Sequence, residues 1–230
     1  LLIIMNSTSL LPRNFIVPFV LVTTLFSLWG FANDITNPMV AAFKNVLLLS
    51  HFESSLVQAA FYGGYCVMAI PAALFIRRFT YKSGILAGLV LYALGCLLFI
   101  PAGNARDFSF FLAAYFIMTS GLAFLETTAN PYILSMGPPE TAARRLNFAQ
   151  AFNPVGSLLG MFVAKDLILG RLDPADETVR RAMAESAPEA FQKIQIADLA
   201  VIVGPYAILG GIVLFAMVAF ALAKLPDSTS

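Results

Sequence analysis

Charged side chains are scarce in this sequence. Lys, Arg, Asp and Glu together make up 12% of its 230 residues, whereas hydrophobic residues make up 59%. The mean hydropathy of +0.82 is outside the range of soluble globular domains and is typical of polytopic membrane proteins. A net charge of +1 gives no reason to expect a nucleic-acid partner. The lipid bilayer is therefore the first partner that the composition predicts.

Metal-binding and catalytic motifs are also missing. The sequence has one histidine, His51, and two cysteines, Cys66 and Cys96, which lie in separate apolar stretches. A zinc site needs clustered Cys or His ligands, and a catalytic triad needs a histidine beside a nucleophile. No phosphate-binding loop of the Walker type occurs. We therefore expect a protein that is not an enzyme and has neither metal nor cofactor, and we interpret both cysteines as small packing residues.

Apolar runs long enough to cross the bilayer recur six times. A helix that rises about 1.5 Å per residue needs about 20 residues to cross roughly 30 Å of hydrocarbon. The predicted spans are residues 15–43, 54–76, 84–101, 108–136, 146–169 and 197–224. Residues 1–14 lack the features of a cleaved signal peptide, so we expect the first span to be the targeting signal. The sequence predicts an all-α polytopic membrane protein with six transmembrane helices.

Basic residues concentrate in the linkers on one side of the predicted spans. The linkers after the second and fourth spans and the two chain ends contain Arg13, Arg77, Arg78, Lys82, Arg144, Arg145 and Lys224. The opposite short loops contain only Lys44 and Arg106. By the positive-inside rule, both termini are expected to be cytoplasmic. The longer loop at 170–196 mixes both signs of charge, and its part from 176 to 193 is expected to be helical and external.

Two carboxylates interrupt the apolar runs near half depth. Asp34 lies about 19 residues into the first span, and Glu126 about 18 residues into the fourth. A charged group at the bilayer centre costs roughly 2.5–3.5 kcal/mol on insertion scales, so such residues usually have a function. Neither acid has a base near it in its own span. Because burial disfavours the charged form, we expect both to exchange protons when access to water changes; the alternative is a permanently neutral, hydrogen-bonded acid.

An Asn-Pro pair follows each acid, as Asn37-Pro38 after Asp34 and as Asn130-Pro131 after Glu126. With six spans, the first and fourth helices run in opposite directions. This pattern is typical of an inverted repeat, in which spans 1–3 and 4–6 are related by a pseudo-two-fold axis in the membrane plane. Corresponding residues of the two repeats then converge on one site near the midplane.

Amide side chains accompany the acids and continue into the fifth span. Asn33 and Asn37 are one turn apart, and the fifth span carries a polar stripe of Asn147, Gln150, Asn153 and Ser157. Amides both donate and accept hydrogen bonds, which suits sugar hydroxyls. Pro38, Pro131 and Pro154 each free a backbone carbonyl, which indicates a wet cavity between the first, fourth and fifth spans. The candidate substrate-binding residues are Trp29, Asn33, Asn37, Asn130, Gln150 and Asn153, with packing of helices as the alternative for Trp29 and Asn147.

Four segments of the chain resemble the N-terminal half of the fucose–proton symporter family within the major facilitator superfamily. They are residues 28–33 (LWGFAN), 58–65 (QAAFYGGY), 125–131 (LETTANP) and 145–153 (RLNFAQAFN). The resemblance implies that Glu126 is the proton-coupling acid of the fourth span and that Gln150 and Asn153 line the sugar cavity. It also implies a twelve-helix transporter, of which this chain would be one half. The other half would be a missing C-terminal half or a second copy.

The first span departs from the pattern of that family. The pattern in the fucose transporters of that family is Trp-Gly-x-Ala-Asn-Asn-x-Asn-Asp, and its coupling aspartate aligns with Asn37. This sequence instead has an acid one turn earlier, at Asp34. We expect the acid to keep its role with an altered geometry, because residues three apart lie on nearly the same helix face. In the loop between the second and third spans, Arg77 replaces the superfamily's usual aspartate, and Lys82 is retained.

The function predicted from the sequence is proton-coupled symport of a monosaccharide, fucose or a related hexose, across a bacterial inner membrane. A sodium-coupled sugar transporter is the nearest alternative. A membrane receptor or assembly subunit would need no titratable acid at half depth. A drug exporter of the same superfamily would be expected to have a more aromatic cavity with fewer amides than the fifth span provides.

Overall fold

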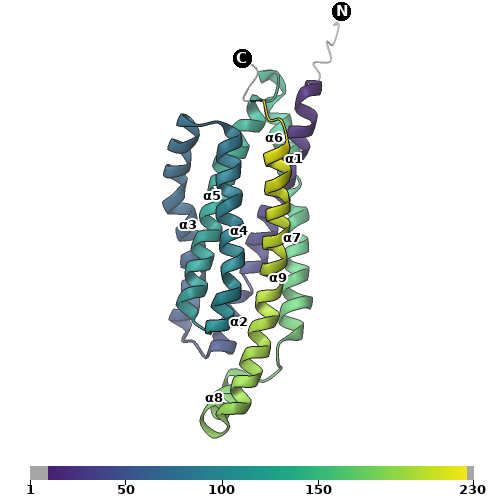
Figure 1. The fold of residues 1–230 in the computed structure, drawn as a ribbon. Helices are drawn as coiled ribbons and strands as arrows, with labels where there is room; N and C mark the ends of the chain where they lie inside the picture. Colours follow the sequence, from purple (N-terminus) through teal and green to yellow (C-terminus); the bar gives the residue numbers. More distant parts are fainter. Residues whose placement is uncertain (1–9, 227–230) are drawn as a thin grey trace, which may run out of the picture.

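The computed structural model describes residues 10–226, which form a bundle of helices running roughly along one long axis (Figure 1). Six of its helical segments are long and apolar enough to cross a membrane. The predicted all-α fold with six membrane helices is therefore confirmed. Both ends of the described chain lie at the same end of the bundle (Figure 1).

The first and fifth spans are each built from two helices. The first consists of α1 (Ile16–Thr36) and α2 (Met39–Leu47), and the fifth of α6 (Ala142–Gln150) and α7 (Asn153–Phe162). The second, third and fourth spans are the continuous helices α3 (His51–Arg78), α4 (Tyr81–Ala105) and α5 (Phe108–Ser135). A π-helical turn, Val163–Ile168, extends α7. After the short α8 (Glu177–Ser186), the sixth span is α9 (Pro188–Leu222).

Proline explains two helix breaks but does not break every helix that contains it. The helical hydrogen-bond pattern is interrupted at Asn37 and Pro38, although both keep right-handed helical dihedral angles, because the proline nitrogen cannot donate to the carbonyl four residues earlier. It does so again at 151–152, just before Pro154. In contrast, α5 continues past Pro131 to Ser135. Pro38 of the first span and Pro154 of the fifth thus accompany helix breaks, whereas the fourth span stays one continuous helix.

Glycines allow the closest helix contacts. In α7, a side chain at Gly156 would overlap the backbone of Ser27 in α1, and one at Gly160 would press on the carbonyl of Phe31. Gly88 of α4 lies in the same way against α5. The two Gly-x-x-x-Gly segments of the sequence, Gly84 to Gly88 and Gly156 to Gly160, are therefore contact faces between helices. The contact of α1 with α7 corresponds, under the inverted repeat, to that of α5 with α3, and both are extensive.

Arg145, in the first turn of α6, is fully buried against the turn between α5 and α6. Its guanidinium donates only to uncharged acceptors among the described residues: the hydroxyl of Thr141 and the carbonyls of Leu10, Ile133, Leu134, Gly137 and Pro138. Saturation of the guanidinium donors stabilises a buried charge that has no carboxylate beside it. Arg145 thus fixes the segment before α1 to the α5–α6 turn.

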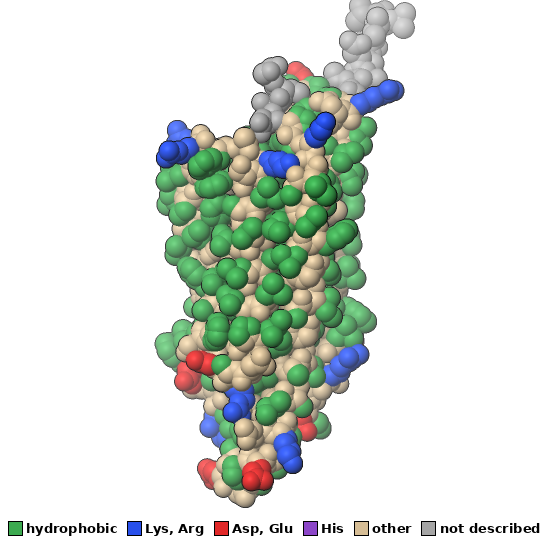
Figure 2. Space-filling model, viewed as in Figure 1, with side chains coloured by type: hydrophobic (Ala, Val, Ile, Leu, Met, Phe, Trp, Pro, Cys, Tyr) green, Lys and Arg blue, Asp and Glu red, His purple; other side chains and the backbone are tan. Residues whose placement is uncertain are grey.

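At the other end of the bundle, α8 is held against α2 and α9 by charged groups. Arg180 and Asp198 form a buried ion pair of 2.5 Å. Glu177 bonds Lys44 of α2 at 2.8 Å and Arg181 at 2.9 Å, and these hydrogen bonds hold the pKa of its carboxyl below the usual value. Charged side chains of both signs gather at this end, and the middle of the bundle presents mainly hydrophobic side chains (Figure 2). The part expected to be helical, 176–193, is divided between α8 and the start of α9, and its external placement stays a prediction.

Candidate functional site

Polar side chains from five helices line two adjoining cavities. The first, of about 510 Å³, lies between α3 and α5, and we call it the acid cavity. The second, of about 630 Å³, lies between α1, α3, α6 and α7, and we call it the amide cavity. Tyr62 and Tyr65 of α3 line both. The remaining residues are Cys66, Ala69, Ala123, Glu126, Thr127 and Asn130 in the acid cavity, and Phe26, Trp29, Asn33, Gln150, Asn153 and Pro154 in the amide cavity.

Glu126 supplies the carboxylate of the acid cavity. It lies in the middle of α5, half-buried, with Thr127 and Asn130 on the same cavity wall. Within residues 10–226 its carboxyl group has neither a hydrogen bond nor an ion pair. A small gap lies between α1 and α5 and is lined by both Glu126 and Trp29. A carboxylate without a protein partner is free to take up a proton or to bind a ligand donor.

Tyr65 connects the two cavities. Its hydroxyl is buried and makes no well-aligned hydrogen bond within the described part of the chain. Tyr65 shares the acid cavity with Glu126 and the amide cavity with Trp29. A buried hydroxyl without a partner costs roughly 1–3 kcal/mol, so such a group usually meets water or a ligand.

The break between α6 and α7 positions two amides in the amide cavity. Gln150 ends α6, and its Nε2 donates to Oδ1 of Asn130 at 3.4 Å. Asn153 begins α7, and its Nδ2 donates to the Phe26 carbonyl at 3.3 Å. Both bonds exceed the usual length of about 2.9–3.0 Å, so they are weak and leave the amides available to a stronger partner. The hydroxyl of Ser27 braces the break by donating to the Phe152 carbonyl at 3.0 Å.

The other predicted site residues divide between cavity and periphery. Trp29, Asn33 and Asn130 line the cavities, as the sequence predicted for substrate-binding residues. Asp34 is half-buried and is not among the residues that line the two cavities. It follows Asn33 by one position, and successive helix positions differ by about 100°, so the two side chains face different directions. Asn37 is exposed at the break between α1 and α2.

Sequence reasoning missed the part of the site that α3 provides. Tyr62 and Tyr65 are one turn apart in an apolar span, a pattern that also fits ordinary packing, so only their spacing and hydroxyl groups were a signal. Cys66 was expected to be a packing residue, but it is exposed and lines the acid cavity, because it lies on the same face as Tyr62. Cys96 is buried, as expected. Within residues 10–226 no group of three or more His, Cys, Asp or Glu side chains could hold a metal ion.

Comparisons with known proteins identify close similarities along nearly the whole chain. Residues 20–230 match the family model of the Major Facilitator Superfamily. An L-fucose-proton symporter of Haemophilus influenzae is 54% identical over 225 residues, which are 96% of this chain and 52% of that protein. A glucose/galactose transporter of Brucella abortus is 42% identical over 147 residues, 64% of this chain and 36% of that protein.

Solved structures agree in fold with this chain. A crystal structure of a major facilitator superfamily transporter, FucP, in the outward conformation matches with a TM-score of 0.82 and 36% identity. The match covers 94% of this chain and 51% of that one. A structure of the Escherichia coli fucose:proton symporter gives a TM-score of 0.80 at 35% identity. The chain thus spans about half the length of the relatives that it resembles.

Proposed function

Because the chain belongs to the major facilitator superfamily, we propose that it forms one six-helix half of a proton-coupled monosaccharide symporter. One observation carries this proposal: an unpaired carboxylate, Glu126, and four amides lie on one continuous cavity wall, joined by Tyr62 and Tyr65. The carboxylate supplies a proton site, and the amides supply donors and acceptors for hydroxyl groups. The relatives, named as symporters of L-fucose with protons and as transporters of glucose or galactose, support the substrate class.

Glu126 is the proposed proton carrier. In an apolar span a charged carboxylate is costly, so the site favours the protonated form when water is excluded and the ionised form when the cavity is open. Proton release and uptake then follow the change of access that moves the sugar. Asp34 is the second proposed coupling acid, acting from the adjoining position of α1 with Asn37 one turn beyond it.

Gln150 and Asn153 are the proposed main contacts to sugar hydroxyls, together with Asn33 and Asn130. Their present hydrogen bonds to protein are long, so a sugar can replace them without leaving a strong bond broken. The indole of Trp29, in the same cavity, offers an aromatic face to the apolar side of a sugar ring.

The described helices form one wall of the transport pathway. In such transporters, alternating access is a rocking of one bundle against another around a fixed site. We propose that a second bundle of six helices, from a further part of the polypeptide or from a second copy, faces the two cavities. The arrangement is proposed to lie in the bacterial inner membrane with both termini cytoplasmic, supported by the placement of basic residues.

Alanine substitution of the two amides tests the proposed sugar site. We expect Gln150→Ala and Asn153→Ala to weaken sugar binding about 5- to 100-fold, because loss of a buried hydrogen-bond partner costs roughly 1–3 kcal/mol. Asn147→Ala is the matched control, since Asn147 belongs to the same polar stripe but is not among the cavity-lining residues. The measurement is equilibrium binding of labelled hexoses to the purified transporter. Wild-type affinity in both cavity variants would show that the sugar binds elsewhere.

A further inference from the structure

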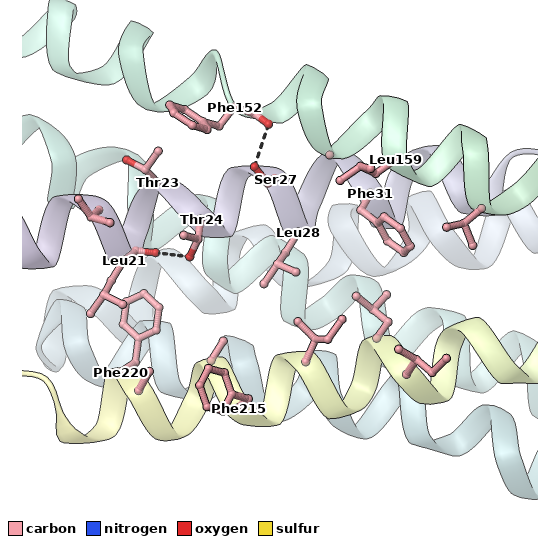
Figure 3. Close-up of a pocket in the computed structure, with 18 of the residues that line it drawn as sticks. Leu21, Thr23, Thr24, Ser27, Leu28, Phe31, Phe152, Leu159, Phe215 and Phe220 are labelled. Carbon is pink, nitrogen blue, oxygen red and sulfur yellow. Dashed lines mark hydrogen bonds between the residues drawn. The ribbon is translucent and has the colours of Figure 1, made fainter.

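A third and larger cavity lies apart from the proposed transport site. It is an apolar groove of about 890 Å³ between α1, α7 and α9, and Figure 3 shows it with Phe31 and Leu28 of α1 and Phe215 of α9 among its lining side chains. None of its lining residues also lines the acid or the amide cavity. The groove therefore lies on a different face of α1 and α7 from the polar site.

The groove exists because α9 packs along α4, whereas its contact with α1 is slight. Small residues on the α9 side, Ala216 and Ala219, leave the space open. Phe215 and Ile212 also line the groove, and their side chains are exposed. The few hydroxyls in the lining are mostly satisfied by the protein: Thr24 donates to the Leu21 carbonyl at 2.7 Å, as drawn in Figure 3. An apolar occupant fits such a wall, and a sugar does not.

The groove begins at one end of the bundle and is long enough for an acyl chain. That end is formed by Phe19 and Phe148, whose rings stack at 5.9 Å, and by Phe220 near the end of α9. The lining continues for about 18 Å along α1, as far as Phe31, and for about 22 Å along α9, as far as Pro205. Half of the hydrocarbon thickness is about 15 Å, so the groove extends across one leaflet and past the middle of the bilayer. The end at Phe19 is the one at which both termini lie, the proposed cytoplasmic side.

Basic side chains lie beyond this end of the groove, in the segment before α1, in α6 and in the segment after α9. Arg144 precedes Phe148 by one turn of α6, Lys224 follows Phe220 by four residues, and Arg13 lies two turns before Val20. All three are exposed, and none has an ion pair or a side-chain hydrogen bond within residues 10–226. Free cations at the cytoplasmic surface between membrane helices attract anionic lipid head groups.

We propose that this groove is a binding site for one anionic phospholipid of the cytoplasmic leaflet. An acyl chain lies between α1, α7 and α9, and the phosphate lies among Arg13, Arg144 and Lys224. The lipid fills the space that α9 leaves beside α1 and thereby joins the sixth span to the first and fifth. The proposal depends on the membrane position of the groove and is independent of which substrate is transported.

Native mass spectrometry of the whole protein in detergent tests the site, with phosphatidylglycerol as the anionic lipid and phosphatidylcholine as the zwitterionic one. Ala216→Phe fills the groove, and Val218→Phe is the matched control, because Val218 is exposed on the same helix but does not line the groove. We expect one phosphatidylglycerol to stay bound to the wild-type protein and to Val218→Phe. In Ala216→Phe, the affinity should fall at least tenfold. Equal retention by the two variants would overturn the proposal.

Charge removal tests the head-group contact separately. The double variant Arg144→Gln plus Lys224→Gln should lower phosphatidylglycerol affinity about fivefold per charge and leave phosphatidylcholine affinity unchanged. Lys193→Gln, an exposed change near the opposite end of α9, should have no effect. If the double variant binds both lipids as the wild-type protein does, the proposed phosphate site is refuted. Protein that binds no lipid at any ratio, because its own polypeptide fills the groove, would refute the whole proposal.

Discussion

At the scale of single residues, Tyr65 stands between the proposed proton site and the proposed sugar site. A hydroxyl can donate only one hydrogen bond, so we expect that, when Glu126 is ionised, donation from Tyr65 to its carboxylate competes with donation from Tyr65 to a sugar oxygen. Protonation of Glu126 would release the tyrosine hydroxyl for the substrate. This competition offers a direct physical link between proton uptake and sugar affinity.

Tyr65→Phe removes that hydroxyl and keeps the ring. We expect sugar affinity to fall about 2- to 12-fold, the equivalent of one hydrogen bond of roughly 0.5–1.5 kcal/mol, and the dependence of affinity on pH to become weaker. Binding measured between pH 5 and pH 8 checks both effects. Tyr81→Phe is the control, because Tyr81 lines neither cavity. An unchanged affinity and pH profile in Tyr65→Phe would assign this tyrosine to packing.

Asp34 permits a test of register in the first span. Asp34→Asn alone should impair sugar-induced proton uptake, because it removes the second proposed coupling acid. Asp34→Asn combined with Asn37→Asp should restore much of that uptake, because the acid then lies one turn away on nearly the same face. The measurement is proton uptake by vesicles across pH 5–8. Normal coupling in the single variant would show that Asp34 is structural.

The residue scale also shows what the sequence could and could not predict. It could be predicted that Glu126, Gln150 and Asn153 line a cavity, because a polar side chain in an apolar span needs a partner or a cavity. The contribution of α3 to the cavities could not be predicted, because a tyrosine in an apolar span fits packing as well as it fits binding. The direction of Asp34 depends on how α1 is rotated against α7, which is decided by contacts distant in sequence.

At the scale of elements, the helix pair α1 and α7 holds the amide cavity in shape. The pair is in contact because Gly156 has no side chain to overlap Ser27. Gly156 and Gly160 have the Gly-x-x-x-Gly spacing that is typical of such close approach. At Pro154 the sequence predicted only a freed backbone carbonyl. It could not predict the break at 151–152, since the hydrogen bond from Ser27 that braces the break comes from another helix.

Gly156→Ala should destabilise the protein by roughly 1–3 kcal/mol, because the new methyl group forces the two helices apart. Gly211→Ala is the matched control: no atom lies within 4 Å of a methyl group added there. It should be neutral or slightly stabilising, because alanine is the better helix former. Thermal unfolding in detergent, followed by circular dichroism, measures both variants. Equal unfolding temperatures would contradict the packing described for α1 and α7.

At the scale of the whole molecule, the six helices separate two kinds of surface. A polar wall on α1, α3, α5, α6 and α7 contains the acid and amide cavities, and an apolar groove lies on another side, toward α9. The inverted repeat accounts for the polar wall, because it brings the corresponding first and fourth spans there. It does not account for the groove, because the contact of α4 with α5 is extensive and the corresponding contact of α9 with α1 is slight. The hydropathy pattern predicted the number of helices, and the paired acid and Asn-Pro elements predicted the repeat.

The central claim is that Glu126 carries the proton that drives sugar uptake, and one substitution tests it most directly. Glu126→Gln keeps the size of the side chain but cannot release a proton. In vesicles with the complete transporter, we expect it to abolish sugar-induced proton uptake and concentrative transport while sugar counterflow, which needs no net proton movement, remains measurable. Glu140→Gln, a change at an exposed acid outside the cavities, should behave as wild type. Proton-driven sugar accumulation at the wild-type level in Glu126→Gln would contradict the account.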